Sequence, residues 1–110
     1  MVKSILKFTF LGLMLGAAAA QAQNPANGKA IFIKQQCFRC HGTDGQGGAG
    51  ARLAPNPPSV AVMQKYVRNP TGNMPPYTNQ LSDGDIADIR AYLAAVPAPP
   101  AVKDIPLLNQ

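Results

Sequence analysis

The stretch Cys37-Phe38-Arg39-Cys40-His41 places one cysteine on each side of two other residues, and a histidine directly follows the second cysteine. This spacing is the attachment signature of a c-type haem. On a helical turn Cys37 and Cys40 share a face, so both thiols can add to the two vinyl groups of one porphyrin. His41 comes next and can bind the iron from the same side. The sequence therefore predicts one covalent haem c, anchored by Cys37 and Cys40 and ligated axially by His41.

Zinc sites and redox dithiols also use two cysteines separated by two residues. The chain has two cysteines and one histidine in all, which supply three zinc ligands where a structural zinc site needs four. No pattern of alternating strands and helices supports a thioredoxin-like dithiol protein. The rest of the chain therefore disfavours this class.

The start of the chain has the pattern of an export signal. Residues 1–7 are basic, and residues 8–20 form a largely apolar run that is too short to span a bilayer comfortably. Ala20-Gln21-Ala22 is a small-x-small cleavage site. We predict a signal peptide over residues 1–22, a periplasmic location, and no stable membrane anchor after cleavage. An uncleaved anchor is the alternative.

The length of 110 residues allows one domain, and a chain this small needs a staple such as a disulfide, a metal or a cofactor. A haem supplies such a body for the core to pack against. The net charge of +5 includes Lys3 and Lys7, which leave with the signal peptide. The other basic residues are scattered and are not interleaved with aromatic residues. The sequence therefore disfavours nucleic-acid binding.

Polar capping residues and apolar stripes predict three helices, over residues 24–36, 59–68 and 82–95. Gly28 and Phe32 share one face of the first helix, and glycine costs helix propensity. We expect Gly28 to allow close approach by another helix. Residues 42–50 form a glycine-rich loop that we expect to wrap the histidine side of the haem.

The second axial ligand is predicted from the stretch Met74-Pro75-Pro76-Tyr77. The two prolines disfavour a helix there and hold the backbone extended, so helical periodicity does not explain the methionine. Met63 lies on an apolar helical stripe, where core packing explains it better. We therefore predict Met74 as the axial ligand opposite His41. A thioether favours ferrous iron and closes the sixth coordination site.

The order of these elements resembles that of small class I cytochromes c of bacteria, over nearly all of residues 24–96. The resemblance implies an all-α cytochrome c fold, with three to four helices wrapped around one covalently attached haem. It assigns thioether, axial and helix-crossing roles to residues of this chain. The thioether and axial positions are matched by Cys37, Cys40, His41 and Met74, and the helix crossing by Gly28, Phe32 and Tyr92.

One segment departs from the family pattern. After the haem motif the family often shows Gly-Pro-x-Leu, and a carbonyl there accepts the N–H of the proximal histidine. Here the segment reads Gly50-Ala51-Arg52-Leu53. The sequence does not decide which carbonyl binds His41. Arg52 is a candidate for a contact with a haem propionate, and a solvated side chain is the equal alternative.

These observations predict a periplasmic one-electron carrier rather than an enzyme. We expect a signal peptide (1–22), a cytochrome c domain (23–96) and a proline-rich tail (97–110). The partners are redox proteins, expected to be a periplasmic dehydrogenase and a downstream acceptor. Free diffusion and a role as the cytochrome subunit of the dehydrogenase both stay open, and the apolar run Ile105-Pro106-Leu107-Leu108 favours the subunit. The alternative class is a haem enzyme or gas sensor with an open sixth site.

Overall fold

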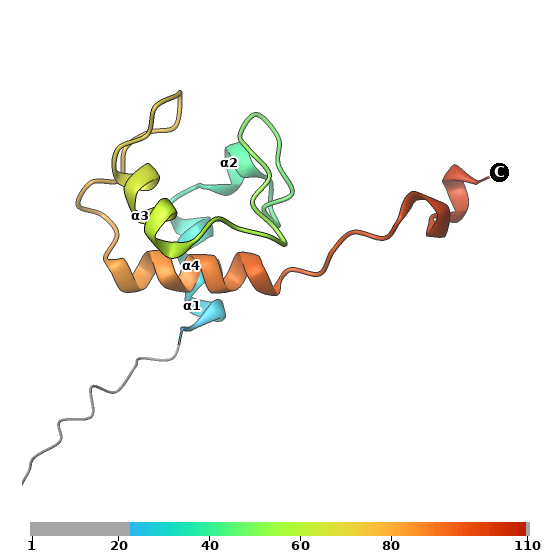
Figure 1. Ribbon diagram of the computed structural model, residues 1–110, viewed down its shortest axis with the longest axis horizontal. Helices are drawn as coiled ribbons and strands as arrows, with labels where there is room; N and C mark the ends of the chain where they lie inside the picture. The colour runs from blue at the N-terminus through green and yellow to red at the C-terminus, as the bar shows by residue number, and fades with distance from the viewer. Residues whose placement is uncertain (1–22, 110) are drawn as a thin grey trace, which may run out of the picture.

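The computed structural model describes residues 23–109, so the predicted signal peptide at 1–22 and the last residue of the predicted tail, Gln110, lie outside the described residues. The described part is helical and holds no strand, which confirms the all-α prediction (Figure 1). The elements are α1 (Pro25–Lys34), α2 (Phe38–His41), α3 (Val60–Arg68), α4 (Asp83–Ala95) and two 3-10 turns, η1 (Val102–Asp104) and η2 (Pro106–Leu108).

Each of the three predicted helices begins directly after its predicted polar cap. The side chains of Asn24, Ser59 and Ser82 each accept a hydrogen bond from a main-chain N–H in the first turn of their helix. Ser82 and Asp85 form a full capping box, with both hydrogen bonds at 3.0 Å. Helix α1 ends before the predicted boundary because Gln36 adopts a positive φ of 61°, which turns the chain into α2.

Helices α1 and α4 cross at the centre of the domain, and their main chains touch there. A Cβ atom on Gly28 would overlap the main-chain oxygen of Asp88 and would lie 2.8 Å from the main-chain nitrogen of Ile89. Beside this contact the rings of Phe32 and Tyr92 pack at a tilt of 59°, with their centroids 5.6 Å apart. The expected close approach at Gly28 is therefore confirmed, and glycine is required there for steric reasons.

The core forms around this crossing. Helix α3 packs against α4 and contributes Met63, as its apolar stripe predicts. The side chains of Phe32, Ile86 and Leu93 are almost fully buried. The complete set of buried hydrophobic residues is Phe32, Ala54, Met63, Leu81, Ile86, Ile89, Tyr92 and Leu93.

A carboxylate on α4 ties down the start of α1. Asp88 accepts hydrogen bonds from the main-chain N–H of Asn24 and from the side-chain amide of Asn27, both at 2.8 Å. The bond from Asn24 is the larger cause, and together the two bonds lower the pKa of Asp88 below its ordinary value of 3.8. The ionised form of Asp88 is therefore the form that the folded state stabilises.

The segment after α4 leads away from the helices (Figure 1). Its proline content predicts an extended chain, and the structure places two short 3-10 turns in it, η1 and η2. Main-chain bonds such as that from Asp104 N–H to Ala101 O, at 2.8 Å, form these turns. Within residues 23–109, no helix combines the length and the apolar character needed to cross a membrane.

Replacing Gly28 by alanine should destabilise the protein, because the new methyl group overlaps the backbone of α4. We expect the free energy of unfolding to fall by about 1–3 kcal/mol, as in overpacked cores. Gly84→Ala is the control, since its nearest neighbour would be Ser82 Oγ at 3.7 Å. Urea unfolding of both variants measures the difference. Equal effects at the two positions would show that the close crossing does not limit stability.

Replacing Asp88 by asparagine should reduce stability in a pH-dependent way. The folded-state pKa of Asp88 lies below its ordinary value of 3.8. The stabilisation by its carboxylate is therefore fully present above pH 3.8 and is lost as the pH falls through the folded-state pKa. The variant should therefore be less stable than the wild type near neutral pH, and the two should converge in acid. Thermal unfolding of both proteins, from neutral pH to below pH 3.8, tests the prediction. Asp104→Asn, in η1, is the control for the removal of a carboxylate that does not bind the start of α1.

Candidate haem site

The cysteine–histidine motif forms a helical turn. Cys37 has helical dihedral angles, with φ −57° and ψ −33°, and caps α2, which runs from Phe38 to His41. Both cysteines are free thiols, with Cys40 exposed and Cys37 half-buried. Burial raises the pKa of the Cys37 thiol, and a main-chain hydrogen bond opposes part of that shift. The two sulfur atoms are thus presented from one short helix, as the spacing predicts.

A cavity of about 470 Å³ opens beside this helix. The residues that line it come from two parts of the chain. The attachment motif contributes Cys37, Cys40 and His41, and the connection between α3 and α4 contributes Met74. A cavity of this size lies within the range of about 300–1,000 Å³ that is usual for cofactor sites. The structure thus brings four of the five predicted site residues to one cavity.

The ring of His41 is oriented by a main-chain carbonyl. Its Nδ1 lies 2.6 Å from the oxygen of Ala51. A carbonyl accepts and cannot donate, so Nδ1 carries the proton and Nε2 keeps a free lone pair. Nε2 is therefore the nitrogen that can bind a metal. The question left by the departure from Gly-Pro-x-Leu is answered here, because Ala51 stands in the proline position and supplies the carbonyl.

The glycine-rich loop holds His41 in this orientation. Gly47 N–H donates to His41 O at 2.7 Å, and Gly50 N–H donates to Cys40 O at 2.8 Å. A Cβ atom on Gly50 would lie 3.0 Å from Cε1 of the His41 ring, so a side chain there would press on the imidazole. Gly50 is a site residue that the sequence prediction did not single out. Its position directly before Ala51, whose carbonyl accepts the hydrogen bond from His41, is the signal that identifies it.

The connection that carries Met74 is fixed where it enters and leaves the helices. Arg68, at the end of α3, forms an ion pair with Asp83 at 2.6 Å and donates to Leu81 O at 3.2 Å. Tyr77 N–H donates to Val67 O at 2.9 Å. Met74 itself is half-buried on the cavity wall. The sequence prediction missed Arg68 and Tyr77, because their partners are not visible in any local pattern.

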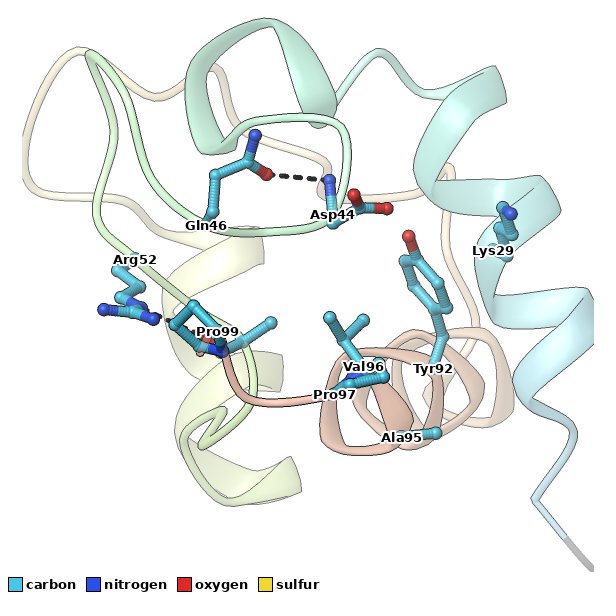
Figure 2. A pocket seen from close by; sticks show the side chains of 10 residues that line it. Lys29, Asp44, Gln46, Arg52, Tyr92, Ala95, Val96, Pro97 and Pro99 are labelled. Carbon is cyan, nitrogen blue, oxygen red and sulfur yellow. Dashed lines mark hydrogen bonds between the residues drawn. The ribbon is translucent and has the colours of Figure 1, made fainter. Parts of the chain in front are cut away.

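Arg52 does not line this cavity. It lines a second cavity of about 550 Å³, together with Lys29, Asp44 and Tyr92 (Figure 2). Its Nε donates to Ala54 O at 3.1 Å, and Figure 2 shows it across the cavity from Lys29. The contact between Arg52 and a haem propionate stays a prediction.

The residues of the first cavity fit a covalently bound haem. Two free thiols offer the thioether anchors, the Nε2 of His41 offers a nitrogen ligand, and Met74 offers a soft sulfur ligand. Two tyrosines, Tyr66 and Tyr77, also line the cavity and supply aromatic surface. The donor set therefore has the chemistry that a haem c needs.

Comparison with known proteins identifies one family. The family model described as cytochrome C oxidase, cbb3-type, subunit III matches residues 23–93. The match begins just before α1, ends within α4 and includes every residue of the first cavity named above. No curated protein and no solved structure matches the chain significantly.

Proposed function

Because the chain belongs to the c-type cytochrome family described as cytochrome C oxidase, cbb3-type, subunit III, we propose that it is a periplasmic one-electron carrier whose haem iron is bound by His41 and Met74. Family membership makes the chain a c-type cytochrome with covalently bound haem c, an electron-transfer protein that works with redox proteins. Cytochromes of this family typically function outside the cytoplasm. The periplasmic location rests on the signal-peptide pattern of residues 1–22.

The observation that carries the proposal is that Met74 and His41 line the same cavity as the two thiols. When bound, the haem supplies a one-electron couple at its iron. Cys37 and Cys40 hold it covalently, and Ala51 keeps His41 in the tautomer whose Nε2 is free. The thioether of Met74 would stabilise the ferrous state, raise the potential and exclude small ligands. This set of residues would therefore favour electron transfer over reaction with oxygen.

The tail supports a stable protein partner. The side chains of Val102, Leu107 and Leu108 are 66%, 80% and 62% exposed, and we call them the apolar tail surface. The side-chain amide nitrogen of Asn109 carries two N–H donors and lies 2.9 Å from three main-chain oxygens of the same segment, those of Val102, Lys103 and Ile105. Val102 O and Ile105 O also accept hydrogen bonds from main-chain N–H groups. These carbonyls are already satisfied, so burying this surface in a partner does not leave them without hydrogen bonds.

The charge of the tail favours a protein partner over a lipid surface. Lys103 and Asp104 stand side by side and cancel, so the segment lacks the cluster of basic residues that anionic membranes attract. An exposed apolar surface on such a neutral segment is typical of a protein contact. We therefore propose that the chain is the cytochrome subunit of a periplasmic dehydrogenase, which delivers electrons to the haem, and that a further redox protein accepts them.

Met74→Ala should open the iron while leaving the fold intact. We expect loss of the sulfur–iron absorbance band at the red edge of the ferric spectrum, a markedly lower potential, and carbon monoxide binding. Met63→Ala should keep the band and instead lower the free energy of unfolding by about 2–5 kcal/mol, because Met63 is buried in the core. If the two variants exchange these outcomes, Met63 is the ligand. If the wild type lacks the band and binds carbon monoxide, the open-site class of haem enzyme or gas sensor replaces the carrier.

Substitution of the apolar tail surface should release the cytochrome from its partner. In a periplasmic extract, gel filtration followed by haem absorbance should show the wild type in a larger complex and the double variant Leu107→Ser, Leu108→Ser at the size of the free protein. Both side chains are exposed, so stability should change by less than about 0.5 kcal/mol. Val62→Ser, in α3, removes a different exposed apolar side chain and should leave the complex intact. A wild type that elutes at the free size would favour a diffusing carrier.

A further inference from the structure

We propose that Tyr77 is a positioning residue that holds Met74 at the cavity by joining the methionine wall to the haem-attachment wall. The inference rests on the proposed binding of the iron by His41 and Met74. Tyr77 lines the same cavity as these two residues and lies three positions after Met74. Its role follows from two hydrogen bonds that reach different helices.

The first hydrogen bond fixes the main chain of Tyr77 to α3. Its N–H donates to Val67 O at 2.9 Å. Between Met74 and Tyr77 stand Pro75 and Pro76, whose rings fix φ and leave little freedom in the backbone. The position of Tyr77 is therefore transmitted to Met74 through a stiff stretch of chain.

The second hydrogen bond crosses to the end of α1. The Tyr77 hydroxyl donates to Gln35 O at 2.9 Å, in a partly buried position. Gln35 is the C-cap of α1, where helix geometry leaves carbonyls without an intrahelical partner. The hydroxyl thus satisfies a carbonyl that lies two residues before Cys37. It ties the segment that presents the methionine to the segment that presents the thiols.

Losing this hydroxyl should loosen the methionine rather than remove it. In the variant Tyr77→Phe the phenylalanine ring would still fill the place of the tyrosine ring on the cavity wall. The hydrogen bond to Val67 would remain because it uses the main chain. The Met74 wall would then be held less firmly against the attachment wall. An external ligand that competes with the methionine sulfur for the iron should therefore bind more tightly.

Tyr92 offers a matched control. Its hydroxyl is also partly buried and also donates to a distant main-chain carbonyl, that of Thr43, at 3.2 Å. Tyr92 lines the second cavity and not the one that holds Met74 (Figure 2). Removing either hydroxyl deletes one comparable hydrogen bond. Thr43 lies in the loop on the histidine side of the site, so the two variants separate an effect on Met74 from a general loss of stability or a change on the histidine side.

The experiment compares haem-loaded wild type, Tyr77→Phe and Tyr92→Phe. Imidazole is titrated into each ferric protein, the red-edge sulfur–iron band is followed, and urea unfolding is measured alongside. We expect both variants to lose about two- to tenfold in the folding equilibrium constant. We expect Tyr77→Phe alone to bind imidazole about two- to tenfold more tightly than the wild type.

Two results would overturn the positioning role. One is an unchanged imidazole affinity in Tyr77→Phe, and the other is an equal gain in affinity in both variants. A wild-type protein without the sulfur–iron band would remove the premise, because Met74 would then not be the ligand. This last outcome is read from the wild type, so it is distinguished from a failure of Tyr77 itself.

Discussion

The contact between the main chains of α1 and α4 at Gly28 determines how the two halves of the haem site face each other. Helix α1 leads directly into the turn that presents Cys37, and α4 begins where the connection carrying Met74 ends. The crossing leaves no space for a Cβ atom, so the separation of these helices is set by backbone atoms. The tilted packing of Phe32 on Tyr92 fills the space beside the contact.

Main-chain atoms orient the ring of His41. The carbonyl that accepts the hydrogen bond from His41 Nδ1–H belongs to Ala51, at a position where the family often has proline. Every residue type supplies such a carbonyl, which explains how the pattern can change at this place while the tautomer of the histidine is kept. What the neighbouring position does require is a small residue, because Gly50 packs against the imidazole ring. The loop therefore constrains size at Gly50 more strongly than side-chain identity at Ala51.

The features that could be predicted from the sequence are those encoded within a few residues. Ser82 with Asp85 specifies the start of α4, and the motif from Cys37 to His41 specifies a helical turn with both thiols on it. The close helix approach at Gly28 was also predicted, but other interactions that depend on the completed fold were not. The hydroxyl of Tyr77 meets a carbonyl 42 positions away, and Arg68 reaches Leu81 and Asp83 after a connection of irregular chain. The bend at Gln36 was missed because a positive φ at a non-glycine residue carries no strong local signal. The turns of the tail were missed because its prolines favour extended chain as well as the start of a 3-10 turn.

The stretch from Pro97 to Ala101, with its three prolines, separates the helices from the apolar tail surface. Proline-rich chain extends by about 3.1 Å per residue and bends little, so this spacer sets a reach of roughly 15 Å. A cytochrome held through its tail would therefore stay at about that distance from its docking point. Linkage of this kind keeps the cytochrome at its partner, so electron transfer does not depend on repeated collisions in solution. The same short tether would keep one cytochrome molecule attached to its partner while it accepts an electron from the donor and passes it to the acceptor.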